Sequence, residues 1–345
     1  MKRTVLFVIF VVFLAGLGFA QSDLQPAAII NLIRSEPITV KQLRTEVERM
    51  EQGAQRPLTA DERRQVLDVM INERLAIQAA ERDRVAVSEN DINQQLQQFK
   101  AQLSQSVNRQ VTDAEFAQAV RTQTGLDMNA FREQARRQLV VQKYLMSKKQ
   151  NIFEGLREPT EEEILNVYNL SKSRFVRPET VRFSMIQVAY GNDRVRAKEL
   201  ADRLFREVGS SAAKFDEVAL RGQAANSGYQ AGDGGYLPRN LEAQQIVGLD
   251  FINTAFSLKL EEVSKMMEGA MGFQFIKVTE AYAMKNLELS DIFQLGTRVT
   301  VRDYIRQALG QEKEQALLAQ ATEELVTELR AGGSSFQVFE NNISW

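Results

Sequence analysis

The chain has 345 residues, with 43 lysines and arginines against 45 aspartates and glutamates, and a formal net charge of −2. It contains no cysteine and no histidine, which excludes disulfides, the usual zinc and copper ligand sets, and mechanisms that need a thiolate or an imidazole. We therefore expect no metal and no cofactor. No basic stripe stands out either, so we expect no nucleic acid partner.

The first twenty residues predict a secretory signal. Lys2 and Arg3 precede an apolar run from Val5 to Ala20, and Gly18 and Ala20 provide small residues for a signal peptidase. An uncleaved membrane anchor is the alternative, but the run is shorter than the ~20 apolar residues that cross a ~30 Å hydrocarbon core. We therefore expect residues 1–20 to be a signal peptide, and the remaining chain to be periplasmic and not integral to the membrane.

The next part of the chain predicts a short strand and turn over residues 28–38, followed by helices. Each helix start is indicated by a hydroxyl residue with Glu, Gln or Asp three positions later, the pattern of a capping box. These pairs are Thr39 with Gln42, Thr59 with Glu62, Ser88 with Asp91, Thr112 with Glu115, and Thr160 with Glu163. A further helical segment is expected over 127–150.

The composition changes twice along the chain, which predicts an α+β fold with a small α/β domain inserted into a mainly helical one. The predicted limits are 21–177 for the helical part, 178–283 for the inserted domain, and 284–345 for the C-terminal part. We expect two C-terminal helices, 300–309 and 312–329, and a last strand over 335–339. The second helix carries the apolar residues Leu317, Leu318, Ala321, Leu325 and Leu329. Strands at the two ends of the chain would pair with each other.

The helical part resembles the N-terminal domain of SurA-like periplasmic chaperones, a group that includes the exported foldases PrsA and PpiD. The matching segments are Pro37-Ile38-Thr39, residues 66–75, Ala79-Ala80-Glu81 and residues 87–92. The resemblance implies an ATP-independent chaperone that binds unfolded or partly folded exported proteins, including those of the envelope and outer membrane.

The segment 181–279 resembles the parvulin family of peptidyl-prolyl isomerases. A strand-like run over 181–188 comes first, and another over 272–278 comes last. Between them, Phe215 lies in a helix like that of the family, and Asp233 and Gly235 match its glycine-rich turn. The cluster over 232–235 lacks the spacing of a P-loop, so no nucleotide is expected.

The polar residues that parvulins place around the proline pocket do not occur at the matching positions. Met185 and Gln274 stand where the family has histidines. Ala225, or its neighbour Ala224, stands at its Cys/Asp position, and Gly269 and Met271 stand at its hydroxyl positions. We therefore assign no catalytic residue. The predicted substrate-binding residues are Val247, Phe251, Met271 and Gln274.

Three functions stay open. Isomerisation must lower a rotation barrier of ~18–20 kcal/mol without breaking a bond, and a hundredfold acceleration needs only ~2.7 kcal/mol. The first hypothesis is a chaperone whose parvulin-like domain has weak or no isomerase activity. The second is an active prolyl isomerase that uses Phe251, Val247 and Gln274. The third is a dedicated subunit of an envelope or secretion assembly.

Overall fold

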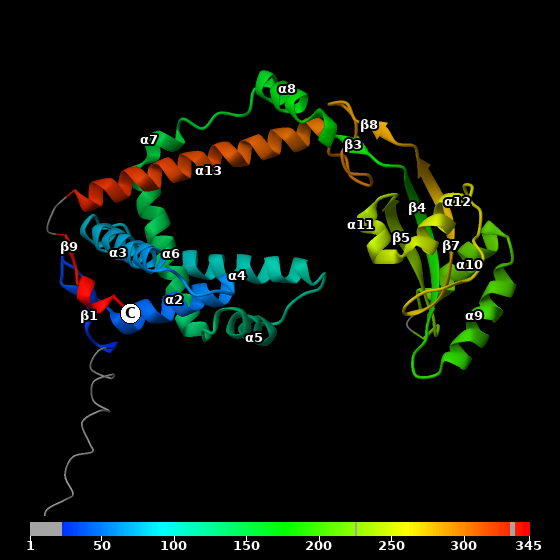
Figure 1. The fold of residues 1–345 in the computed structure, drawn as a ribbon, viewed down its shortest axis with the longest axis horizontal. Helices are drawn as coiled ribbons and strands as arrows, with labels where there is room; N and C mark the ends of the chain where they lie inside the picture. Colours follow the sequence, from blue (N-terminus) through cyan, green and yellow to red (C-terminus); the bar gives the residue numbers. More distant parts are fainter. Residues whose placement is uncertain (1–22, 225, 332–334) are drawn as a thin grey trace, which may run out of the picture. The chain divides into compact units, whose positions relative to one another are not determined.

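The computed structural model describes residues 23–224, 226–331 and 335–345, so the predicted signal peptide and Ala225 lie outside the described residues. The chain divides into two compact units (Figure 1). The outer unit comprises residues up to Arg157 and from Lys313 onward, and the inserted unit is Glu158–Glu312. The domain limits predicted from the sequence, 21–177, 178–283 and 284–345, remain predictions.

The outer unit is mainly helical. Its helices before the insertion are α2 (Val40–Ala54), α3 (Ala60–Arg82), α4 (Glu89–Ser106), α5 (Asp113–Thr124), α6 (Met128–Lys148) and α7 (Gln150–Phe153). All four capping boxes predicted in this unit are confirmed, at Thr39, Thr59, Ser88 and Thr112. In each, the hydroxyl accepts a hydrogen bond from the backbone N–H three residues later, and the side chain at that position accepts one in return.

A three-stranded antiparallel sheet joins the two ends of the outer unit. Its strand order is β2 (Glu36–Thr39), β1 (Pro26–Ile30), β9 (Phe336–Val338), and a 3₁₀ turn, η2 (Glu340–Asn342), follows. Ala28 lies opposite Val338 and Ile30 opposite Phe336. The predicted pairing of the end strands is therefore confirmed.

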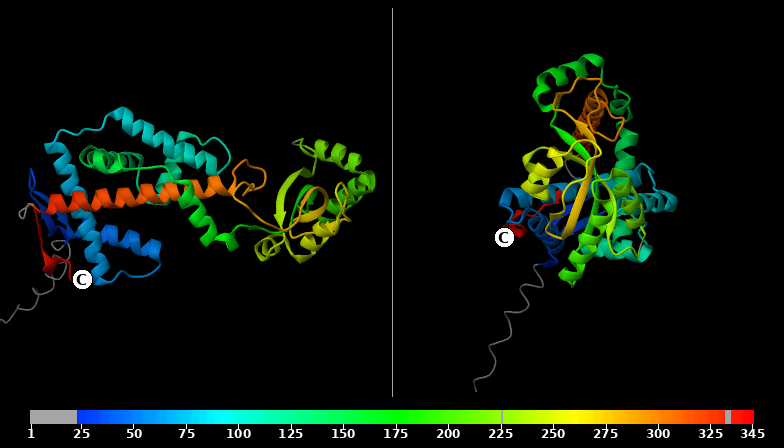
Figure 2. Two further views of the ribbon diagram at one scale, coloured as in Figure 1. Left: turned by 90° about the horizontal axis from the view of Figure 1, so that it is seen from above. Right: turned by 90° about the vertical axis from the view of Figure 1, so that its right-hand side faces the viewer.

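The C-terminal helix α13 (Val301–Arg330) is one helix of 30 residues, and Figure 2 shows it running without interruption. The prediction of two helices, 300–309 and 312–329, is therefore wrong. Gly310 lies between the two predicted segments, but a glycine in a helix interior costs only ~1 kcal/mol relative to alanine, and good helix formers flank it. Ala321, Leu325 and Leu329 face the core of the outer unit, together with Leu67, Ile71 and Leu75 of α3.

The inserted unit contains a four-stranded antiparallel sheet of order β5-β4-β7-β6. The strands are β4 (Thr180–Ala189), β5 (Gln230–Pro238), β6 (Met267–Glu268) and β7 (Gly272–Tyr282). Helices α9 (Arg194–Val208) and α10 (Ala212–Gly222) pack on one face of the sheet. Helices α11 (Leu241–Val247) and α12 (Leu249–Ser257) pack on the other (Figure 1). The expected α+β fold is confirmed.

A smaller part of the inserted unit precedes and follows this sheet. It comprises α8 (Glu161–Leu170), the 3₁₀ turn η1 (Lys172–Arg174), the paired strands β3 (Val176–Arg177) and β8 (Lys285–Asn286), and the first turns of α13. The predicted capping box of Thr160 with Glu163 opens α8. A hydrophobic cluster here contains Ile164, Tyr168, Phe175, Leu287, Val301 and Ile305.

The glycine cluster over 232–235 forms a β-bulge inside β5, where the sequence predicted a turn. Phe183 of β4 lies opposite Gly235, and the next residue, Ser184, lies opposite Asp233, so one residue of β5 is unpaired. Gly235 has φ = 79°, which a residue with a side chain rarely adopts, and its N–H donates to Asp233 Oδ1 over 2.9 Å. The bulge therefore bends β5 next to the middle of the sheet.

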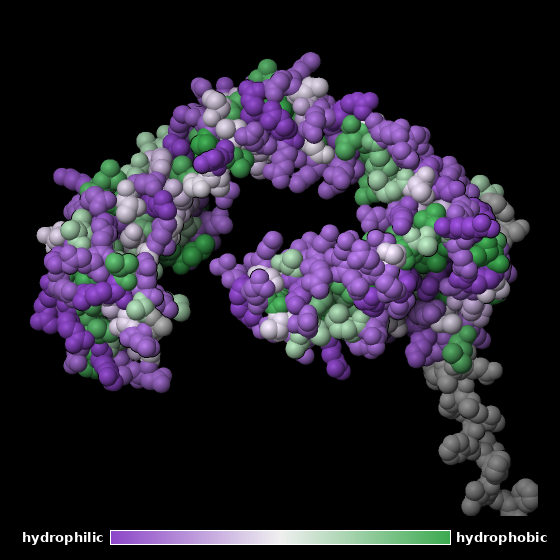
Figure 3. All heavy atoms as spheres, turned by 180° about the vertical axis from the view of Figure 1, so that it is seen from behind, coloured by the Kyte–Doolittle hydropathy of each residue, from purple (hydrophilic) through white to green (hydrophobic). Residues whose placement is uncertain are grey.

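Hydrophobic side chains also reach the surface, where they lie among hydrophilic ones on the face drawn in Figure 3. In the part of the chain that the structure describes, no helix is both long and apolar enough to cross a membrane.

Candidate functional site

The face of the sheet covered by α11 and α12 carries the predicted proline-binding floor. Phe251 of α12 is 6% exposed, and its ring meets Phe183 of β4 edge-on at 5.4 Å between centroids. Met185 of β4 and Val247 of α11 pack partly buried against the same cluster. The sequence places Val247 here because Gly248, at φ = 88°, separates α11 from α12. The result is a largely buried apolar cluster built from both helices and the central strand.

Gln274 lies beside this floor on β7. It pairs with Gln187 of β4 on one side and with Met267 of β6 on the other, and residues directly opposite each other share a face of the sheet. Ile276, two residues along β7, belongs to the same cluster as Phe251. Because alternate residues of a strand point to the same side, Gln274 lies on the face of the sheet that α11 and α12 cover. A Cβ at Gly269 would lie 2.9 Å from Gln274 Nε2, so the two residues are in contact. Two amide side chains therefore border the apolar floor.

The structure brings most of the predicted site residues together, but not all of them. Met185, Val247 and Phe251 form one cluster, with Gln274 and Gly269 at its edge. Met271 is 76% exposed in the turn between β6 and β7, apart from that cluster. Ala225 lies outside the described residues. The substrate-binding role of these residues stays a prediction.

The ionisable side chains nearest the bulge of β5 are held in a separate network. Arg182 of β4 donates hydrogen bonds to Asp233 and to Glu280, the latter over 2.8 Å. The hydrogen bond from Arg182 keeps the pKa of Asp233 below its ordinary value. The hydroxyl of Tyr282 donates to Glu280, and this bond raises the pKa of Tyr282 to about 12. Asp233 is thus ionised and paired, which leaves it poorly suited to proton transfer near neutral pH.

A buried lysine lies on the opposite face of the sheet. Lys277 of β7 is 3% exposed, and its Nζ lies 2.8 Å from oxygens of both Asp216 on α10 and Glu261 after α12. Burial lowers the pKa of this ammonium group, but the two hydrogen bonds outweigh it, so the pKa lies above its ordinary value. Both carboxylates are more than half exposed, so this group links three segments rather than forming a pocket.

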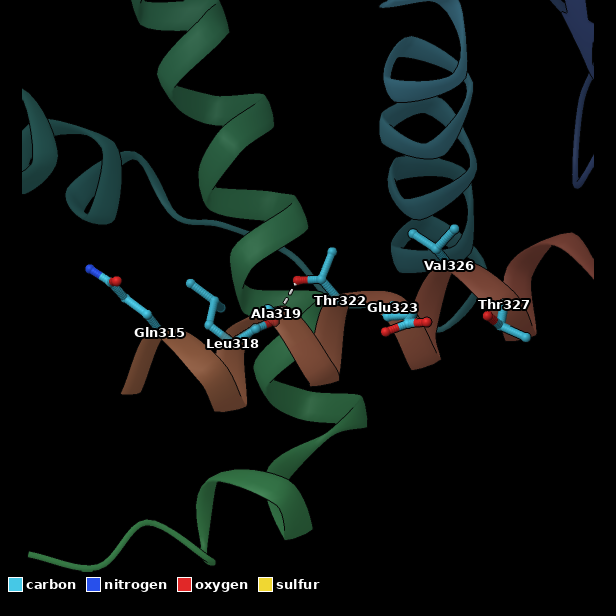
Figure 4. Close-up of a pocket in the computed structure, with 7 residues that line it drawn as sticks. All are labelled: Gln315, Leu318, Ala319, Thr322, Glu323, Val326 and Thr327. Atoms are coloured by element: carbon cyan, nitrogen blue, oxygen red, sulfur yellow. Dashed lines mark hydrogen bonds between the residues drawn. The ribbon is translucent and has the colours of Figure 1, made fainter. Parts of the chain in front are cut away.

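The outer unit has a shallow, open groove along one side of α13, and all of the residues that line it belong to this helix. Leu318, Thr322 and Val326 point to the same side of the helix, and the Thr322 hydroxyl donates to the Leu318 carbonyl (Figure 4). Leu318 is 46% exposed. The neighbouring Leu317 packs against the core of the outer unit, and one position along a helix is a rotation of about 100°. Leu318 faces the groove instead of the core.

A second cleft, in the inserted unit, was also missed. It is lined by aromatic and aliphatic side chains of α8, η1 and α13 and of the loop before α13, including Phe175, Phe293 and Tyr304. These residues are far apart in sequence, and single aromatic residues do not distinguish a cleft from a core. Residues 168–175 and 293–304 contain only two aromatic residues each, which is too weak a pattern to predict a cleft.

The fold consists of a mainly helical outer unit with an inserted unit built on a four-stranded sheet, and each of the two parts matches a known family of domains. Residues 1–145 match the SurA-like N-terminal domain, and residues 159–292 match the PPIC-type PPIase domain. The resemblance seen in the sequence is thereby confirmed for both parts. Together the SurA-like N-terminal domain and the PPIC-type PPIase domain account for most of the chain.

Individual relatives are distant. The chain is 28% identical to chaperone SurA of Alcanivorax borkumensis over 239 residues, which are 67% of this chain and 50% of the relative. It is 22% identical to foldase protein PrsA of Clostridium botulinum, over 86% of this chain and 79% of the relative. It spans 64% of chaperone SurA of Saccharophagus degradans. Thus the chain spans about half to two thirds of the length of these SurA relatives.

A solved structure of a SurA-like chaperone from Campylobacter jejuni aligns with a TM-score of 0.39 at 11% identity, covering 91% of this chain and 99% of that one.

Proposed function

We propose that this protein is an exported, ATP-independent chaperone for unfolded or partly folded envelope or outer-membrane proteins. In this proposal its parvulin-like domain binds polypeptide but has weak or no prolyl isomerase activity. The observation that carries the proposal is the composition of the face under α11 and α12. Phe251, Met185 and Val247 form its floor, Gln274 and Gln187 border it, and none of these side chains titrates near neutral pH.

Such a face suits binding better than catalysis. Stabilising a twisted amide requires interactions that are stronger in the transition state than in the ground state. Preorganised polar groups are the usual source of these interactions, and here an amide such as Gln274 offers one hydrogen bond. The apolar floor contributes affinity to the planar and the twisted amide alike. We therefore infer that the domain holds proline-containing segments without much accelerating their rotation.

Two further features support binding of extended polypeptide. Strands β5 and β6 are the edges of the four-stranded sheet, and an edge strand offers unpaired N–H and C=O groups to an added strand. The groove of α13 offers apolar area at Leu318 and Val326. The relatives carry the names chaperone SurA and foldase protein PrsA. These names and the N-terminal apolar run support export to the periplasm.

An active prolyl isomerase is the second candidate. It is favoured by one observation, namely that Gln274 lies on the same face of the sheet as Phe251 and Met185. A dedicated assembly subunit is the third, and a pull-down distinguishes it, because it would retain one stoichiometric partner instead of many unfolded clients.

We expect the substitution Leu318→Asp to weaken binding of unfolded client about fivefold. A charge in the groove removes apolar contact area worth about 1 kcal/mol. The measurement is the concentration of protein that halves the aggregation of a denatured outer-membrane protein on dilution. Ala316→Asp adds the same charge at an exposed position of α13 that does not line the groove, and we expect it to behave as the unsubstituted protein. Equal aggregation curves for the two variants would exclude the groove as a client site.

A further inference from the structure

The second cleft, in the inserted unit, is distinct from the parvulin-like face. Its volume is about 390 Å³, and its walls come from α8, η1, the loop after β8 and the first turns of α13. Phe293 and Tyr304 stack with centroids 4.2 Å apart, and Phe175 meets both rings edge-on, at 6.0 Å and 6.4 Å. Tyr304 is 44% exposed, so a ring of this trio is open to an incoming group.

Two side chains of opposite charge line the cleft. Arg174 belongs to η1 and Glu312 to α13, and both side chains are exposed. Among the residues that the structure describes, neither has an ion-pair partner, although most charged side chains around them are paired: Arg302 and Arg306, for example, both contact Glu161. An apolar cleft with one unpaired base and one unpaired acid is complementary to a segment that carries both charges beside an apolar residue.

The volume of the cleft favours an extended over a helical backbone in a bound segment. A helix with its side chains is about 10 Å across, so 390 Å³ would hold only about one turn of it. An extended chain advances about 3.3 Å per residue and projects a single side chain sideways, which fits the space without requiring secondary structure.

We propose that this cleft is a polypeptide-binding site for an extended segment with one large apolar side chain flanked by a basic and an acidic residue. The apolar side chain lies against Tyr304 and Phe293, the basic residue pairs with Glu312, and the acidic residue pairs with Arg174. The inference rests on the proposed function in one respect, that the occupant is unfolded polypeptide.

The test uses the complete protein and a fluorescently labelled peptide, Gly-Ser-Lys-Gly-Leu-Gly-Glu-Gly-Ser, with binding followed by fluorescence anisotropy. Ala308 lines the cleft at an exposed helix position, so Ala308→Phe fills the cleft without disturbing the core. We expect Ala308→Phe to weaken binding at least tenfold. Gln307→Phe, at the neighbouring exposed position outside the cleft, should stay within twofold. A peptide with Ser in place of Leu should bind at least tenfold more weakly to the unsubstituted protein.

The charges are tested separately. Glu312→Lys should weaken binding of the peptide about threefold or more, and should have no effect on a peptide in which Gln replaces Lys. Equal affinities for the Ala308→Phe and Gln307→Phe variants would overturn the proposal. So would a dimer, seen by sedimentation, that Ala308→Phe disrupts, because the occupant would then be a second copy of the chain. If the peptide binds as expected but the protein does not suppress aggregation of denatured clients, the cleft stands and the proposed chaperone function fails.

Discussion

The double variant Asp216→Asn, Glu261→Gln is expected to lower the free energy of unfolding of the inserted unit by about 3 kcal/mol. Lys277 is 3% exposed, and these two carboxylates are its ion-pair partners at 2.8 Å. Removing the partners of a buried charge costs about 3–5 kcal/mol, because the charge remains without compensation. We expect the lower end of this energy range because both carboxylates are more than half exposed and therefore screened by water. Urea denaturation followed by circular dichroism measures the loss.

The matched control is Lys277→Met. It removes the buried charge and leaves two exposed carboxylates, so we expect a change of no more than about 1 kcal/mol. If the double variant were as stable as the Lys277→Met variant, the ion pairs would contribute nothing to this unit.

The same group implies a pH dependence at the alkaline end. The pKa of Lys277 is raised in the folded state by its hydrogen bonds to the two carboxylates, against the effect of burial. A raised folded-state pKa contributes stability that is fully present below the unfolded value of about 10.4 and is lost as the pH rises through the folded-state pKa. The stability advantage of the unsubstituted protein over Lys277→Met should therefore decrease between pH 10 and 12 and stay constant between pH 7 and 9.

Gly272→Ala is expected to destabilise the inserted unit by about 3 kcal/mol. A Cβ at Gly272 would lie 2.2 Å from the Val188 carbonyl oxygen and 2.9 Å from Ala189 Cα, which are backbone atoms of the paired strand β4. Backbone cannot rotate away as a side chain can, so β4 and β7 must separate at the end of their ladder. The free energy of unfolding from urea titrations tests this expectation.

Gly310→Ala is the matched control on the same unit. Nothing lies within 4 Å of a Cβ at Gly310, and the residue is in the middle of α13. Alanine restricts the unfolded chain and favours the helix, so we expect a gain of about 0.5–1 kcal/mol. A neutral Gly272→Ala variant would show that the two strands are not held as closely as the structure indicates.

Much of the fold could be predicted because its signals are local. The capping boxes at Thr39, Thr59, Ser88, Thr112 and Thr160 depend on side chains three residues apart, and every one is present. The pairing of β1 with β9 followed from economy, since the strand predicted at the end of the chain had no other predicted strand of the outer part near it in sequence. In contrast, whether α13 continues through Gly310 depends on a small difference in free energy between a continuous and an interrupted helix, and the flanking residues determine its sign.

The candidate sites were predicted less well, and the reason differs from one to the next. The floor at Phe251 and Val247 came from the family resemblance, which supplies a three-dimensional arrangement that spacing alone does not. The groove at Leu318 was missed because its apolar residues are interspersed with polar ones along α13, and such a mixed pattern does not indicate a binding surface. The cleft at Phe293 and Tyr304 was missed because it joins segments more than a hundred residues apart, and such contacts leave no periodic signal in one sequence.

The central claim is that the parvulin-like domain binds proline-containing segments but does not efficiently rotate them. The most direct measurement is cis/trans exchange of an Ala-Pro-Phe peptide, observed by NMR with the purified protein in catalytic amounts. The account predicts exchange at or near the uncatalysed rate, together with saturable binding of the peptide. Strong acceleration that is lost in a folded Phe251→Ala variant would contradict it, because an apolar floor with Gln274 would then be sufficient for catalysis.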